Sequence, residues 1–140
     1  MKIEATEYLA RVNALRSKMA EENVDLVVGF SNLLEIAIVR YYCGFAPVNE
    51  SAAIVIPAEG EAVVCTGQAS YDYCLVHNAL PNSRIAILPE YMEPWLPREL
   101  RMAQIFPAPL QVESVLIFNR ERATPLETDF FEYIRDHYKP

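Results

Sequence analysis

The spacing of apolar side chains predicts an amphipathic helix over residues 4–22. The apolar positions recur at intervals of four, three and four residues: Tyr8, Val12, Leu15 and Met19. Asn23 follows directly, and asparagine commonly ends a helix in the left-handed conformation. A short continuous apolar run at residues 25–30 then predicts a strand that is covered on both faces.

A second helix and a β-hairpin are expected next. Ser31 is expected to cap a helix that runs through about Val39. Its inward-facing side chains are expected to be Leu34, Ala37 and Ile38. Residues 52–56 and 62–66 both have the composition of strands, and the turn between them contains Gly60, which can adopt a positive φ.

The rest of the chain is predicted to alternate between helices and strands. Residues 68–80 form the first of these helices, with one apolar face: Tyr71, Cys74, Leu75 and Ala79. Strands are expected at residues 84–88 and 112–118, on either side of a proline-interrupted stretch at residues 89–109. A capping box with proline at the first helical position begins the last helix after Thr124.

The resulting order of elements is α-β-α-β-β-α-β-loop-β-α. Such alternation with one hairpin predicts an α/β fold, a mixed β-sheet flanked by helices on both faces. The length of 140 residues lies near the commonest domain size, so a single domain is expected over residues 1–140.

Composition and charge exclude several classes of partner. A net charge of −7 and a pI of about 4.8 argue against binding to nucleic acid or to an anionic membrane surface. No apolar run approaches the roughly 18 residues of a membrane span, and the N-terminus lacks the apolar core of a signal peptide. The cysteines are expected to be buried free thiols in a reducing cytoplasm: Cys43, Cys65 and Cys74.

No catalytic motif stands out in the sequence. The glycines lie too far apart for a phosphate-binding loop, and there is no Gly-x-Ser-x-Gly elbow. His77 and His137 lie in separate predicted helices, so neither catalytic nor metal-binding residues are predicted, and His77 is expected on a helix surface. The stretch Glu-Tyr-Met-Glu-Pro-Trp at residues 90–95 leaves two interpretations open: a cleft or interface, or a loop packed on the sheet.

Several short sequence segments occur in an order that is typical of one protein family. The opening helix with its Tyr and Arg leads into Asn-Val-Asp-Leu-Val-Val at residues 23–28, and Tyr-Tyr-Cys-Gly-Phe follows at residues 41–45. The hairpin, the strand ending at Phe118 and the helix after Thr124 come later. Together these segments resemble the N-terminal domains of the creatinase, prolidase and aminopeptidase P family, the pita-bread metallopeptidases.

The resemblance implies a ribonuclease H-like fold for this chain and a catalytic site that lies in another domain. In relatives a C-terminal domain, absent from this chain, holds two aspartates, a histidine and two glutamates. In the peptidases these ligands bind a pair of divalent ions such as Mn, Co or Zn, which activate water. The resemblance therefore implies no catalytic residue, metal ligand or cofactor in the chain itself.

The N-terminal domain of relatives helps to form dimers and lends residues to the active-site entrance of the neighbouring subunit. By that analogy, the substrate-entrance residues of this chain would be Phe45, Val48, Asn49 and Glu50. In creatinase a phenylalanine and an arginine just before the first hairpin strand contact the substrate. Those positions fall near Val48 and Glu50 here, and neither residue matches, so a creatine-binding role is not supported.

Three hypotheses follow. The leading one is a non-catalytic N-terminal domain of a cytoplasmic Xaa-Pro peptidase-like hydrolase, with the missing catalytic domain and a second copy of the parent protein as partners. The alternative is a free-standing binding or dimerisation module of the same fold without hydrolase activity. The third is an unrelated small α/β enzyme with a site at residues 90–95.

Overall fold

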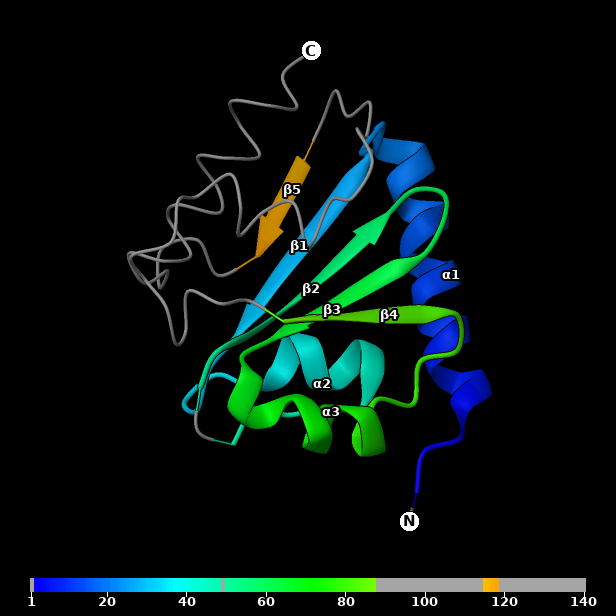
Figure 1. Ribbon diagram of the computed structural model, residues 1–140. Coiled ribbons are helices and arrows are strands. Elements are labelled where there is room, and N and C mark those ends of the chain that lie inside the picture. The colour runs from blue at the N-terminus through cyan, green and yellow to red at the C-terminus, as the bar shows by residue number, and fades with distance from the viewer. Residues whose placement is uncertain (1, 49, 88–114, 119–140) are drawn as a thin grey trace.

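The computed structural model describes residues 2–48, 50–87 and 115–118 of the chain (Figure 1). Its elements, in chain order, are α1 (Ala5–Glu22), β1 (Leu26–Ser31), α2 (Ala37–Cys43), β2 (Ala52–Pro57), β3 (Ala62–Thr66), the 3₁₀ turn η1 (Gln68–Ser70), α3 (Tyr71–His77), β4 (Ser83–Ile87) and β5 (Val115–Phe118).

The five strands among the described residues form one mixed sheet in the order β4-β3-β2-β1-β5, which confirms the predicted fold class. β2 runs antiparallel to β1 and β3, whereas β1 pairs with β5, and β3 with β4, in parallel. The predicted hairpin is present as β2 and β3, and Gly60 in its turn has a φ of 96°. Because only β2 is reversed, the carboxyl ends of the other four strands lie at one edge of the sheet, where β2 begins.

The first helix confirms the prediction from its apolar stripe. Tyr8, Val12 and Met19 are buried, and Leu15 packs against the same core. Asn23 ends the helix in the left-handed conformation, with φ 54° and ψ 47°, and its N–H donates to the carbonyl of Met19. No described helix is both long enough and apolar enough to cross a membrane.

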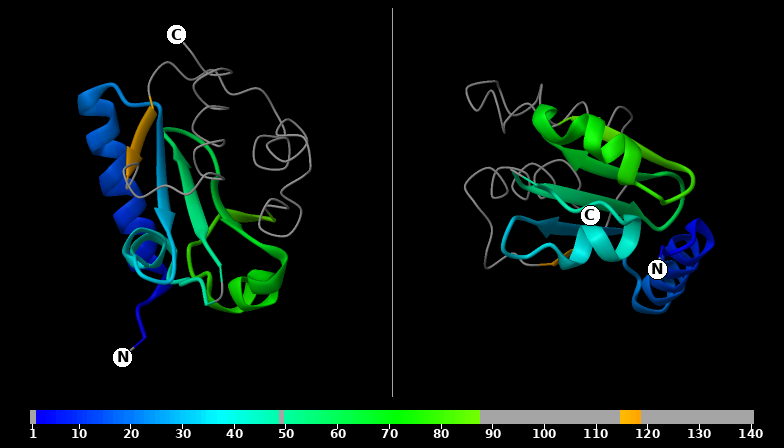
Figure 2. Two further views of the ribbon diagram at one scale, coloured as in Figure 1. Left: turned by 90° about the vertical axis from the view of Figure 1, so that its left-hand side faces the viewer. Right: turned by 90° about the horizontal axis from the view of Figure 1, so that it is seen from below.

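The strands bury side chains on both faces of the sheet. One face joins α1, α2 and α3 in a single core cluster, to which the strands contribute Val27, Ala52, Ile54, Ile56, Ala62 and Val64. Figure 2 shows α1 and α2 on the same side of the sheet. The opposite face is also buried, through Leu26, Val28, Phe30, Ala53, Val55, Val63, Cys65 and Ala86. This explains the continuous apolar runs in the sequence. The stretch 89–109, residues 90–95 within it, and the helix expected after Thr124 lie outside the described residues.

The predicted second helix is wrong in its position. It begins at Ala37 instead of following Ser31, which is still part of β1. The Asn32 side chain explains why the helix starts later in the sequence, because its Oδ1 accepts hydrogen bonds from the N–H groups of Leu34 and Glu35. This local turn competes with helix formation. Leu34, expected to face inward, is 95% exposed.

The predicted third helix is shorter than expected. Residues 68–70 form a 3₁₀ turn, α3 ends at His77, and Asn78 is extended. The side chain of Asn78 stabilises this ending, because its Oδ1 accepts from the N–H of Leu80 and its Nδ2 donates to Ser83 Oγ. Cys74 is buried as predicted, but Leu75 is 53% exposed instead of facing the core.

Candidate functional site

The segment between α2 and β2 lies at the edge of the sheet where β1 and β3 end (Figure 1). In α/β sheets, ligands commonly bind at the edge formed by the carboxyl ends of parallel strands. The described residues expected from the sequence to line a substrate entrance, Phe45, Val48 and Glu50, belong to this segment. The structure describes three of the four, and Asn49 lies outside the described residues.

Phe45 and Val48 have opposite environments, although they are close in sequence. The Phe45 side chain is 0% exposed and belongs to the core cluster, with its ring centroid 6.1 Å from that of Tyr73 in α3. Val48 is 50% exposed. Of this pair, only Val48 presents its side chain to the surface.

Glu50 is partly buried and already has a backbone partner. Its Oε1 accepts a hydrogen bond of 2.9 Å from the N–H of Ser70, the last residue of η1. Gly67, just after β3, lies beside the same carboxylate. Glu50 thus connects the start of β2 to the start of α3, a contact between residues that are distant in sequence.

Two hydroxyl side chains flank the first residue of β2. Ser31 and Thr66 both pair with Ala52 across the sheet, one from each side, and both are buried. Ser31 Oγ accepts from the N–H of Val39 at 3.1 Å, whereas Thr66 Oγ1 has no hydrogen-bond partner among the described residues. Nor does the described part of the chain bring three or more histidine, cysteine, aspartate or glutamate side chains together around a possible metal ion.

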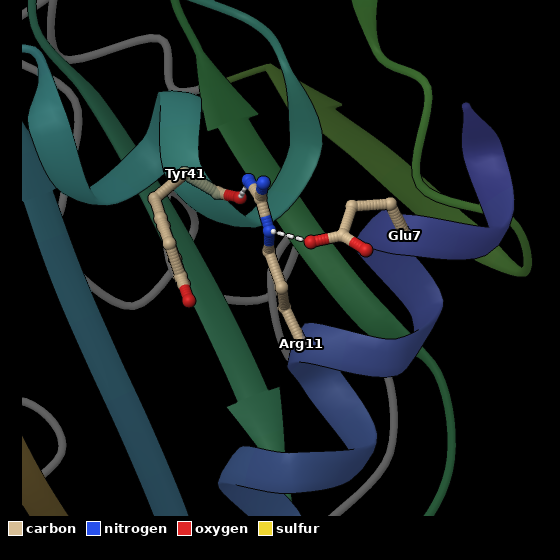
Figure 3. Close-up of polar contacts among 3 residues, drawn as sticks. All are labelled: Glu7, Arg11 and Tyr41. Atoms are coloured by element: carbon tan, nitrogen blue, oxygen red, sulfur yellow. Dashed lines mark hydrogen bonds and ion pairs between the residues drawn. The ribbon is translucent and has the colours of Figure 1, made fainter. Parts of the chain in front are cut away.

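Arg11 makes a second polar connection, which the sequence analysis did not identify (Figure 3). Its Nε donates to Glu7 Oε1 at 3.0 Å, and its Nη1 donates to the carbonyl of Tyr41 at 2.8 Å. The guanidinium carbon also lies 4.4 Å from the Tyr41 ring centroid and 5.3 Å from that of Tyr8. Arg11 therefore ties α1 to the last turn of α2. The spacing of Glu7 and Arg11 in one helix was enough to predict their ion pair. No local pattern in the sequence indicated the contact between Arg11 and Tyr41.

The Tyr-Tyr-Cys-Gly-Phe segment has a structural role. Gly44 ends α2 with a φ of 83°, a conformation that side chains rarely adopt. A Cβ at this position would also lie 2.9 Å from Tyr8 Oη and 3.2 Å from the carbonyl oxygen of His77. Gly44 thus allows α1, α2 and α3 to meet closely.

The three cysteines are buried, as predicted. Burial raises the pKa of the Cys43 thiol to about 12, and burial raises the pKa of Cys74 to about 12 as well. Both thiols are therefore neutral at physiological pH, and neither is suited to act as a nucleophile.

These raised pKa values predict a loss of stability in alkali. A thiol in the unfolded chain ionises near its ordinary pKa of 9.0, whereas in the folded protein it stays neutral up to about 12. The free energy of unfolding should therefore fall as pH rises above 9, by roughly 1 kcal/mol for Cys43 between pH 8 and 10, and Cys74 should add to the loss. Urea titrations at pH 7–10 in the presence of a reductant measure it.

The control for this prediction is the pH slope of the variants. Cys43→Ala and Cys74→Ala lower stability at every pH by leaving small cavities, but each should make the alkaline decline shallower. An unchanged slope in the double variant would show that other groups cause the decline.

Comparison with solved structures finds this fold in proteins of low sequence identity. A proline dipeptidase from Streptococcus agalactiae 2603V has a TM-score of 0.65 and 14% identity, covering 93% of this chain and 88% of that one. The N-terminal domain of a cytoplasmic peptidase from Mycobacterium tuberculosis H37Rv has a TM-score of 0.63 and 18% identity, with coverage of 93% and 88%. The prolidase from Pyrococcus horikoshii OT3 has a TM-score of 0.61 and 16% identity over 92% of this chain.

This chain spans only 30% of the length of the Pyrococcus horikoshii prolidase. No protein-family model matches the sequence, and no curated protein matches it either. The likeness therefore rests on the arrangement of helices and strands. The chain has the fold of the creatinase/prolidase-like N-terminal domain.

Proposed function

We propose that residues 1–140 are the non-catalytic N-terminal domain of a peptidase-like hydrolase of the Xaa-Pro type. The observation that carries this proposal is a contrast in coverage. The chain matches nearly all of two domain-sized structures from peptidases, but less than a third of a longer prolidase. A domain of this fold, with neutral buried thiols and no described metal-ligand cluster, suits a supporting role.

In this proposal the chemistry belongs to a catalytic domain that pairs with this one. A pair of divalent ions, Mn, Co or Zn, would be bound there and would activate water for attack on the peptide bond. The present domain would contribute to a homodimer and to the substrate entrance. The exposed Val48 at the carboxyl edge of the sheet supports the second role. Localisation in the cytoplasm is part of the proposal.

The test compares this chain with the longer protein that the proposal predicts. Purified proteins are assayed on a panel of Xaa-Pro dipeptides, with matched Xaa-Ala dipeptides as controls, after addition of Mn²⁺, Co²⁺ or Zn²⁺. We expect only the longer protein to hydrolyse Xaa-Pro substrates. We also expect the longer protein to sediment as a dimer in sedimentation velocity.

Two outcomes would contradict the proposal. Metal-dependent hydrolysis by the 140-residue chain alone would place a catalytic site within it. A gene without any downstream catalytic domain, together with a stable dimer of this chain, would instead support a free-standing dimerisation module.

A further inference from the structure

Two anchors hold the segment before β2 against the same part of the fold. Phe45 is buried, with its ring next to Tyr73 of α3. Glu50 is hydrogen-bonded through Oε1 to the N–H of Ser70, immediately before α3. Val48 lies between these anchors in sequence and is half-exposed. Val48 is therefore an exposed residue with a fixed neighbour on either side of it in the sequence.

Gly67 makes the second anchor possible. An added Cβ at this position would overlap the Glu50 carboxylate, with Oε2, Cδ and Oε1 as its nearest neighbours. The backbone of Gly67 has φ −78° and ψ 170°, which any residue can adopt. A side chain at this position would therefore be resisted by lack of space and not by the backbone, and the Glu50 carboxylate would have to move to admit it. The missing side chain of Gly67 thus leaves the space that the Glu50 carboxylate occupies.

The Glu50 carboxylate is held by the backbone. No lysine or arginine in the described ranges forms an ion pair with it, and the partner is the N–H of Ser70, which is itself buried. A partly buried carboxylate needs hydrogen bonds to offset the loss of water. The bond to Ser70 consequently restricts where the Glu50 side chain, and the backbone that carries it, can lie.

We propose that Glu50 is a positioning residue that fixes the segment carrying Val48 against the start of α3. Gly67 is the residue that admits the carboxylate. The relevance of this positioning to a substrate entrance rests on the proposed function, but the positioning itself is a property of this chain. Glu50 acts through the segment and needs no contact with a substrate.

The test is amide hydrogen exchange, resolved by residue, on the 140-residue chain and its variants. Glu50→Ala should raise the exchange rate of the Ser70 amide by about threefold to tenfold, since this N–H loses its bond to Glu50 Oε1 and keeps only the 3.3 Å bond to the carbonyl of Gly67. Glu50→Gln retains an acceptor and should show a smaller increase. Val48→Ala is the matched control, because it changes an exposed side chain of the same segment and should leave the exchange of Ser70 unchanged.

Because Gly67 leaves room for the Glu50 carboxylate, the effects of substitutions at these two residues on amide exchange should not be additive. Gly67→Ala should reproduce the faster exchange by displacing the carboxylate, whereas adding Gly67→Ala to Glu50→Ala should have little further effect. Unchanged exchange at Ser70 in Glu50→Ala would overturn the proposal, and so would an equal increase throughout α1 and β1, which would indicate general destabilisation. If Gly67→Ala does not fold, the Glu50→Ala and Glu50→Gln pair still decides the question.

This experiment is independent of the peptidase assay. Faster exchange at Ser70 without peptidase activity in the longer protein would support the positioning role and count against the proposed function alone. In an active longer protein, Glu50→Ala should raise KM severalfold and leave kcat nearly unchanged, because it disturbs an entrance and not the reacting groups.

Discussion

Replacement of Phe45 by alanine is expected to lower the free energy of unfolding by about 3–5 kcal/mol. Phe45 is the largest of the fully buried side chains in the described part of the chain, at 0% exposure, and packs in the cluster shared by the helices and one face of the sheet. Its removal leaves a cavity that the surrounding rigid elements can fill only partly. Urea denaturation monitored by circular dichroism measures the change.

Val48→Ala provides the comparison for Phe45→Ala. This side chain is 50% exposed in the same segment, so its truncation should change stability by no more than about 0.5 kcal/mol. Similar small effects for both variants would mean that Phe45 is not a core residue, and the entrance role inferred by analogy would regain support.

A methyl group at Gly29 is expected to destabilise the protein by about 1–3 kcal/mol. Gly29 lies in β1 between β2 and β5, and an added Cβ would overlap Cγ2 of Ile38 in α2. The carbon Cγ2 is bonded to the Ile38 Cβ, so the side chain cannot simply swing its far end away. The absence of a side chain at Gly29 thus sets how closely α2 approaches the sheet.

A double-mutant cycle tests this explanation. If the overlap with Ile38 is the cause, Gly29→Ala should cost less in an Ile38→Ala background, with a coupling energy of roughly 0.5–3 kcal/mol. Gly60→Ala is the control. Gly60 has open space around it but a φ of 96°, so its cost arises from the backbone and Ile38→Ala should not relieve it. Additive effects of Gly29→Ala and Ile38→Ala would refute the steric account.

The elements with a strong local signal were predictable from the sequence. The stripe along α1 and the left-handed Asn23 are local properties, because both depend on neighbours within one or two turns. The β2–β3 hairpin has a short turn with Gly60, which also makes its pairing local. These three features appear in the structure as predicted.

The second helix was misplaced because two local preferences compete there. The interval between Leu34 and Ile38 fits a helix, but the side chain of Asn32 caps a turn before the helix can start. Similarly, the apolar pattern of residues 68–80 did not reveal that Asn78 ends α3 through its side chain. A polar side chain that bonds to nearby backbone has no periodic signature.

At the candidate site, the sequence predicted the positions of residues along the chain but not their tertiary contacts. The order of elements was enough to place Val48 and Glu50 just before a hairpin strand, and the structure puts that point at the carboxyl edge of the sheet. The burial of Phe45 and the fit of Glu50 beside Gly67 both depend on tertiary contacts. Sequence spacing carries no information about such contacts unless related sequences vary together.

The parallel pairing of β1 with β5 has a consequence for how the protein folds. Residues 26–29 pair with residues 115–118, whereas β1–β2, β2–β3 and β3–β4 all form between segments that are close in the chain. Contacts between distant segments require closure of a long loop and form slowly. During synthesis, the first four strands leave the ribosome well before β5 does, and β1 has one open edge until β5 is made. Any chaperone that protects this edge would act on the nascent chain, before β5 exists.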